Sequence, residues 1–161
     1  MKLFFKRHGE AESLLGPDEG SSLTAEGTRQ VQRLAAKLKE GVCFDLLWSS
    51  PLKRAVETAT ILVESGAAQK PEVSDLLLPS TEPAVLTAFL TQLPELPPVR
   101  GLVGHDPLLS ENDRDVGLWH SSGGSCPQKA GVGVLERESG SFLVAFVSQT
   151  WLEETSLSQS W

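Results

Sequence analysis

Two arginines and two histidines follow apolar segments of this sequence, at positions where a buried strand would end. Arg7 and His8 follow the first apolar run, Arg54 comes shortly after the second, and His105 ends a later one. Guanidinium groups and a protonated imidazole bind tetrahedral oxyanions such as a phosphoryl group. A neutral imidazole nitrogen is also a competent nucleophile near neutral pH. If folding brings the four side chains together, they can both hold and attack a phosphoryl group.

Phosphoryl transfer is the reaction that these residue types support. Arg7 would hold the phosphoryl oxygens, His8 would attack phosphorus in line, and Gly9 would let the chain turn sharply with no Cβ against the substrate. The reaction depends mostly on positioning and on charge stabilisation, which the cations supply. We therefore expect a site with no metal ion and no cofactor.

The segments that must position these residues alternate between strand and helix patterns. Short apolar runs predict strands, and apolar residues recurring every three to four positions predict helices. The expected strands are 3–5, 44–48, 73–78, 99–105 and a hairpin over 131–147 with its turn at 138–141, and the expected helices run from Thr24 to Gly41, from Ser50 onward and over 83–93.

This order of elements predicts an α/β protein. We expect a three-layer α/β/α sandwich with a mostly parallel central sheet and a C-terminal antiparallel hairpin. Thr24 is the expected N-cap of the first helix, and Ser50 that of the second, with Pro51 and Arg54 in its first turn. Ligands of parallel sheets bind beyond the carboxyl ends of the strands, which is where the two arginines and two histidines would converge.

Composition is that of an ordinary globular chain, with 161 residues, 40% apolar and 22% charged. That length predicts a single domain over 1–161, with about 148–161 as a loosely held tail. Cys43 and Cys126 match no metal or redox spacing and are too few for a disulfide scaffold. The first residues lack the pattern of a signal peptide, so we expect a cytoplasmic protein.

A net charge of −7 disfavours partners that are themselves polyanions. We expect neither nucleic acid nor a membrane as partner, and the four tryptophans are too scattered to form a stacking platform for bases. No apolar stretch approaches the ~20 residues of a membrane-spanning helix. The anion site must then be a local concentration of positive charge within an acidic protein.

Four motifs in this order resemble those of the histidine phosphatase superfamily, which has a phosphoglycerate mutase-like fold. They are RHGEAE at 7–12, LTAEGTRQ at 23–30, SSPLKRAVETA at 49–59 and VGHDP at 103–107. The resemblance runs from Lys2 to about Pro107, with weaker agreement at 128–136. The short chain without a large insertion is most similar to the SixA-type phosphohistidine phosphatases.

The resemblance implies a role for each matching residue. His8 matches the nucleophile that becomes phosphorylated, and Arg7, Arg54 and His105 match the phosphate pocket. Relatives also carry a carboxylic acid that protonates the leaving group. Two candidates for that acid stay open here: Glu82, which follows the third expected strand, and Asp18, in the loop after RHG.

The chain departs from the superfamily pattern in two places. Mutases continue RHG with Glu-Ser, whereas Glu10 is followed here by Ala11, which disfavours mutase activity. Relatives follow GHxP with an apolar helix, whereas 109–125 is polar and rich in glycine. This second departure leaves the back wall of the site and the substrate preference undetermined.

Each candidate residue also has an ordinary structural interpretation. Arg54 is a solvated helix residue paired with Glu57 in that interpretation, and His105 is a core histidine with satisfied nitrogens. Glu82 is a residue at a helix start, and Asp18 belongs to a turn. Three functions follow from the sequence: a phosphatase of protein phosphohistidine, a phosphatase of a small-metabolite ester, and a non-catalytic module that binds phosphate or a partner. The physiological substrate and the oligomeric state stay open.

Overall fold

The computed structural model describes residues 2–13, 18–94, 98–105, 132–138 and 141–147. The polar segment 109–125 and the expected tail at 148–161 lie outside this part of the chain. The strands are β1 Lys2–Arg7, β2 Leu46–Ser49, β3 Pro71–Val73, β4 Val99–Gly104, β5 Val132–Glu138 and β6 Ser141–Val147, and the α-helices are α1 Ala25–Lys39, α2 Lys53–Glu64 and α3 Pro83–Gln92. Two 3₁₀ turns, η1 Asp18–Gly20 and η2 Asp75–Leu77, complete the described elements.

The strands form one six-stranded sheet in the order β3-β2-β4-β1-β5-β6. β4 lies between β1 and β2 and is parallel to both, and β3 is parallel to β2. β5 and β6 form an antiparallel hairpin that adds to β1. The predicted fold class is therefore confirmed, because the sheet is mostly parallel and the antiparallel hairpin is C-terminal.

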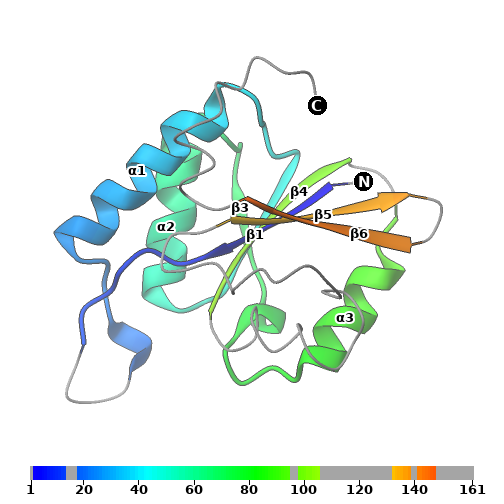
Figure 1. Cartoon of the computed structure of the whole chain (residues 1–161). Helices are drawn as coiled ribbons and strands as arrows, with labels where there is room; N and C mark the ends of the chain where they lie inside the picture. Colours follow the sequence, from blue (N-terminus) through cyan, green and yellow to red (C-terminus); the bar gives the residue numbers. More distant parts are fainter. Residues whose placement is uncertain (1, 14–17, 95–97, 106–131, 139–140, 148–161) are drawn as a thin grey trace.

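Helices cover both faces of the sheet (Figure 1), with α1 and α2 on one face and α3 on the other. The strand order explains this division. The connections through α1 and α2 both advance toward the β3 edge, whereas the connection through α3 returns toward the centre, and right-handed crossovers in opposite directions lie on opposite faces. The first face buries Leu34, Leu38 and Leu62, and the second buries Leu86 and Leu90.

Local sequence determines where α1 begins. The Thr24 side chain accepts a hydrogen bond from the Gly27 amide at 2.9 Å, as predicted for an N-cap. The helix ends at Lys39, and the Gly41 amide donates to the Leu38 carbonyl at 3.0 Å. The predicted helix thus has both expected ends.

Two local predictions are wrong. α2 begins at Lys53 and its N-cap is Leu52, which makes no side-chain bond, so Ser50 is not the cap. The strand expected at 73–78 ends at Val73, and η2 replaces the rest. The strand stops because β2 ends at Ser49, whose carbonyl accepts the Ser74 amide at 2.9 Å as the last bond between the two segments. Beyond it β2 offers no partner.

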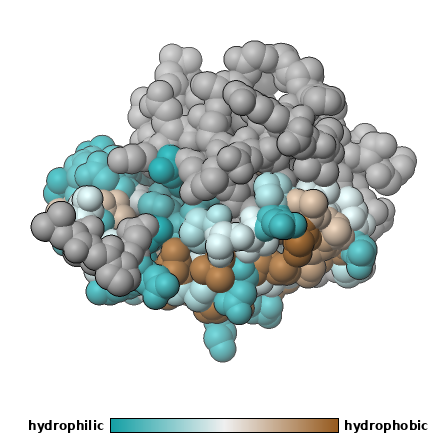
Figure 2. All heavy atoms as spheres, turned by 90° about the horizontal axis from the view of Figure 1, so that it is seen from below, coloured by the Kyte–Doolittle hydropathy of each residue, from teal (hydrophilic) through white to brown (hydrophobic). Residues whose placement is uncertain are grey.

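On the face that Figure 2 shows, the described residues are a mixture of hydrophilic groups and a band of apolar groups. In the part of the chain that the structure describes, the exposed large apolar residues are Val73 on β3, at 59%, and Val85 on α3, at 47%. Among the described residues, no helix is long and apolar enough to span a membrane.

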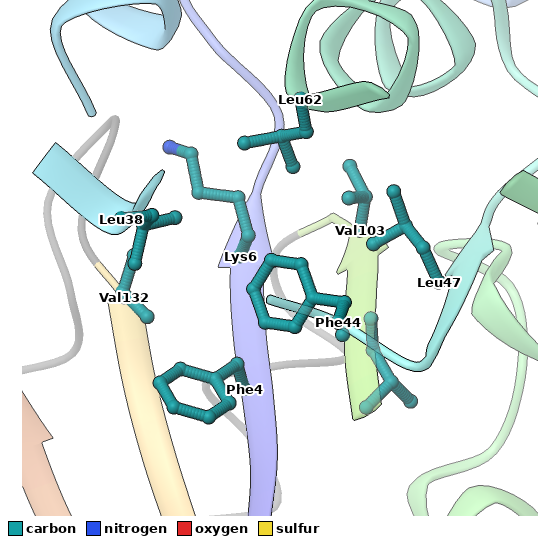
Figure 3. A pocket seen from close by; sticks show the side chains of 10 residues that line it. Phe4, Lys6, Leu38, Phe44, Leu47, Leu62, Val103 and Val132 are labelled. Atoms are coloured by element: carbon teal, nitrogen blue, oxygen red, sulfur yellow. The ribbon is translucent and has the colours of Figure 1, made fainter. Parts of the chain in front are cut away.

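Lys6 is unusual because it points from β1 into the core rather than toward solvent (Figure 3). Its side chain lies between Leu38 and Leu62, beside a cavity of about 10 Å³, room for roughly one water molecule. Only 4% of Lys6 is exposed, and its Nζ has no hydrogen-bond partner within the part of the chain that the structure describes. Burial, and secondarily the charge of Arg7, lower the pKa of Lys6 from 10.5 to about 7.

We expect Lys6→Met to stabilise the protein. Between pH 7 and 10.5 the unfolded lysine binds a proton that the folded lysine does not, so wild-type stability rises with pH across this window. Each unit of pKa depression costs about 1.4 kcal/mol at lower pH. Methionine fills the same space without this penalty.

Thermal unfolding from pH 6 to pH 10 measures the effect. The variant should be more stable than wild type near pH 6, and the difference should shrink toward pH 10. Lys70→Met, at an exposed lysine, is the matched control and should leave the dependence of stability on pH unchanged. An equal or lower stability of Lys6→Met at pH 6 would mean that the buried amine has a partner that stabilises it.

Candidate functional site

The carboxyl ends of β1 and β4 lie side by side and carry the two histidines. Arg7, the last residue of β1, is in register with Gly104, the last residue of β4. The His8 amide donates to the Gly104 carbonyl at 3.0 Å, so the parallel pairing continues one residue past the strand. His105 follows directly, and its ring centroid is 4.9 Å from that of His8 with an interplanar angle of 49°. Residues almost a hundred positions apart thus form a contact pair.

Arg54 joins this pair from the neighbouring helix. It lies in the first turn of α2 and is buried, with only 4% of its surface exposed. Its Nε donates to Nε2 of His8 at 3.1 Å. The alternative of a solvated Arg54 paired with Glu57 is wrong, because Glu57 instead accepts the Leu23 amide at 2.7 Å and lies 4.0 Å from Lys53 Nζ.

The hydrogen bonds of His8 determine which ring nitrogen carries the proton. Its Nδ1 is 2.6 Å from the carbonyl oxygen of Gly9, which can only accept. Nδ1 therefore holds the hydrogen and donates it. The other nitrogen, Nε2, is left with its lone pair, which accepts from Arg54 Nε. An imidazole in this tautomer has its nucleophilic nitrogen on the side of the arginine.

Electrostatics keep the His8 ring neutral. The pKa of His8 is lowered from 6.5 to about 4, chiefly by burial. The bond to the Gly9 carbonyl opposes this shift, and the charges of Arg54, Arg7 and Lys6 act in the same direction as burial. The ring is therefore uncharged across the physiological range. A neutral nucleophile surrounded by cations is suited to an anionic electrophile.

Ser50 holds the second histidine in place. His105 is 1% exposed, and its Nε2 lies 2.8 Å from the Ser50 hydroxyl oxygen. The Ser50 oxygen also accepts the Leu52 amide at 3.4 Å. The sequence prediction missed this role, because it assigned Ser50 to a helix cap. The signal was present in the Ser-Ser-Pro run, which places a short hydroxyl where a strand ends beside the site.

Close packing against α1 fixes the backbone after His8. A Cβ on Gly9 would lie 2.8 Å from a methyl carbon of Val31, and a Cβ on Gly27 would lie 2.0 Å from the Glu10 carbonyl oxygen. The Glu10 carbonyl also accepts the Thr24 amide at 2.9 Å. Only glycine at these two positions lets the helix approach the loop so closely. The sequence interpretation assigned the missing Cβ of Gly9 to the substrate, whereas in the structure that space is taken by α1.

The two candidates for the acid that protonates the leaving group are Glu82 and Asp18. Glu82 is the exposed N-cap of α3, and its side chain makes no capping bond. Because α3 leads back to parallel strand β4, Glu82 lies toward the carboxyl edge of the sheet. Among the described residues no hydrogen bond or ion pair joins it to His8 or His105. The backbone of Asp18 begins η1; its side chain lies outside the described part.

Within the described residues, no group of three or more histidine, cysteine or acidic side chains is arranged to hold a metal ion. The central cluster is made of two arginines and two histidines instead. It lies at the carboxyl edge of β1, β2 and β4 in an α/β sheet, the edge at which such sheets bind ligands.

Comparison with known proteins identifies the family. Residues 3–77 match the model of the histidine phosphatase superfamily (branch 1). An uncharacterized protein of Picosynechococcus sp. is 33% identical over 115 residues, which cover 69% of this chain and 70% of that protein. The chain belongs to the histidine phosphatase superfamily.

Phosphoglycerate mutases match over a shorter segment. The 2,3-bisphosphoglycerate-dependent enzyme of Nautilia profundicola is 38% identical over 68 residues, which cover 39% of this chain and 30% of the mutase. The aligned segment thus spans less than a third of the mutase, and the likeness carries no mutase activity to this chain.

Solved structures share the fold at low sequence identity. The protein histidine phosphatase SixA complexed with tungstate superposes with a TM-score of 0.76 at 24% identity, covering 91% of this chain and 95% of that one. A putative alpha-ribazole-5'-P phosphatase of Escherichia coli gives 0.71 at 21% identity, covering 92% and 96%. Small phosphatases of two kinds therefore share this architecture.

We expect His8 to stay neutral, with its proton on Nδ1, down to about pH 4. Burial and three neighbouring cations oppose a second proton, since the folded pKa lies below the ordinary 6.5. Titration of the ¹⁵N-labelled imidazole by NMR gives both the tautomer and the pKa. A midpoint at or above 6.5, or a proton on Nε2 at neutral pH, would contradict this geometry.

Proposed function

We propose that this protein is a metal-independent phosphatase that acts through a phosphohistidine intermediate on His8. We further propose that its substrate is phosphohistidine on a protein. The observation that carries the proposal is the neutral His8, whose unprotonated Nε2 faces the guanidinium of Arg54. A binding module for phosphate needs the cations, but it has no use for a histidine kept neutral among them.

The first step transfers the phosphoryl group to the protein. The substrate oxygens draw the guanidinium of Arg54 toward them, which releases the lone pair of Nε2. That lone pair attacks phosphorus, the bond from phosphorus to the leaving group breaks, and the leaving group takes up a proton. Arg7, Arg54 and His105 stabilise the charge on the three phosphoryl oxygens.

The second step returns the free protein. A water molecule attacks phosphorus on its far side from His8, the bond from phosphorus to Nε2 breaks, and the water loses a proton. Inorganic phosphate leaves. Nδ1 keeps its hydrogen throughout, because it donates to the Gly9 carbonyl. The phosphorylated ring therefore carries a positive charge, which favours cleavage of the bond from phosphorus to Nε2.

The leaving group separates the candidate substrates. Glu82 or Asp18 would protonate an alkoxide, which is a poor leaving group. An imidazole leaving from phosphohistidine can take its proton from solvent and depends less on such an acid. Glu82 is exposed and bonds to neither histidine within the described residues, and a substrate that depends less on an acid fits this position.

A second candidate function is hydrolysis of a small-metabolite phosphate ester. The structural similarity to the E. coli alpha-ribazole-5'-P phosphatase, with a TM-score of 0.71, supports this candidate. A ratio of kcat/KM for a phosphohistidine protein against a panel of nucleoside and sugar phosphates distinguishes the two. Tight phosphate binding without hydrolysis of any of them would favour the non-catalytic module instead.

His8→Ala should abolish turnover, with a loss of about 1,000-fold or more, because the variant lacks the atom that accepts the phosphoryl group. Rapid acid-free quenching of the wild type with ³²P-labelled substrate should trap label on one histidine, and the variant should trap none. Thr60→Val, on the exposed side of α2, is the control. Turnover of His8→Ala at more than a tenth of the wild-type rate would remove His8 from the mechanism.

The acid is assigned by Glu82→Gln and Asp18→Asn. We expect one of the two to slow hydrolysis of an alkyl phosphate by about 100-fold or more, and to slow phosphohistidine hydrolysis much less. The other variant should behave as wild type on both substrates. If both variants hydrolyse alkyl phosphates at the wild-type rate, neither carboxylate is the acid.

A further inference from the structure

Thr58 connects the nucleophile loop to the arginine helix from a fully buried position. It lies on α2 one turn after Arg54, and none of its surface is exposed. Its hydroxyl donates to the Arg54 carbonyl at 2.7 Å, and the same oxygen accepts the Gly9 amide at 3.2 Å. One hydroxyl therefore serves two segments that are 49 positions apart in the sequence.

These bonds form part of a closed circuit through the site. His8 Nδ1 donates to the Gly9 carbonyl, and the Gly9 amide donates to Thr58. Thr58 donates to the backbone of Arg54, whose side chain donates to His8 Nε2. Four residues thus determine one another's orientation, and Thr58 is the member that lacks contact with the reacting atoms.

The bond to Gly9 is the feature that distinguishes Thr58 from an ordinary helical threonine. Thr60, two positions later, makes the same bond to the carbonyl four residues back, with its hydroxyl 2.8 Å from the Val56 oxygen. Thr60 is exposed and contacts nothing in the loop through that hydroxyl. The back-bond alone is a common habit of threonine in helices. Thr58 differs because its hydroxyl oxygen also accepts a hydrogen bond from a buried amide, that of Gly9.

Gly9 needs such an acceptor more than another residue would. Glycine has wide backbone freedom, and the orientation of its carbonyl decides which nitrogen of His8 holds the proton. The Gly9 amide is buried, so losing its acceptor would leave a donor unsatisfied, which carries an energetic cost. Rotation of the loop backbone toward another acceptor would relieve that cost and turn the Gly9 carbonyl away.

We propose that Thr58 is a positioning residue, whose hydroxyl holds the Gly9 backbone so that His8 presents an unprotonated Nε2 toward the substrate. The expected effect on turnover rests on the proposed function. The effect on the His8 tautomer does not, because it concerns the free protein.

Three variants test this inference. Thr58→Val keeps the shape and removes the hydroxyl, Thr58→Ser keeps the hydroxyl and removes a methyl group, and Thr60→Val removes an equivalent back-bond outside the circuit. In Thr58→Val we expect a mixture of His8 tautomers by ¹⁵N NMR and a fall in kcat of about 10- to 100-fold, with KM changed less. Thr58→Ser should restore the tautomer and most of kcat, and Thr60→Val should match the wild type in both.

The outcomes separate this inference from the proposed function. A Thr58→Val protein that is less stable, yet keeps the single Nδ1–H tautomer and full kcat, would show that Thr58 only supports the fold. A wild type with no phosphatase activity would overturn the proposed function, and the tautomers would still decide the role of Thr58. If Thr58→Val fails to fold, Thr58→Cys replaces it, since a thiol accepts hydrogen bonds only weakly, and unchanged tautomers in Thr58→Cys would overturn the inference.

Discussion

The parallel pairing of β1 with β4 is the constraint on which the rest of the site depends. This pairing brings His8 next to His105. The pairing runs from Lys2 opposite Val99 to Arg7 opposite Gly104, and the His8 amide adds one more bond. Since β4 also pairs with β2, main-chain hydrogen bonds join all three strands that end at the site. The side chains need only extend from a rigid edge.

Two helices then fix what the strands leave free. α1 packs so closely on the loop after His8 that Gly9 and Gly27 have no room for a side chain. α2 supplies Arg54 on one turn and Thr58 on the next, and both bond to this same loop. His8 is therefore held on a short segment between two helices, where its own amide bonds to β4 and the next amide bonds to Thr58.

Sequence patterns predicted the elements well, but they predicted fewer of the contacts between them. The alternation of strands and helices gave the layers and the sheet, because each element buries one apolar face. The predicted ends of elements were wrong where a neighbouring element determines them. The strand expected at 73–78 stops at Val73, because its partner strand β2 ends at Ser49 and offers no further hydrogen bonds. The sequence did not predict the bonds that Ser50 and Thr58 make, because their partners, His105 and Gly9, lie about fifty residues away. The predicted strand ends were enough to bring the arginines and histidines to one edge of the sheet. The catalytic role of this cluster stays a prediction.

The charges of the site explain why it is built in this way. Lys6, Arg7 and Arg54 lie close enough to lower the pKa of His8, in a protein whose net charge is −7. Neighbouring cations repel one another, and the lowered pKa of Lys6, about 7, reduces the positive charge beside His8. The Nε of Arg54 donates to a neutral acceptor, the lone pair of His8. In the mechanism proposed above, a phosphoryl oxygen replaces that acceptor. In that proposal the arrival of substrate frees the Nε2 lone pair of His8, which in the resting protein accepts from Arg54.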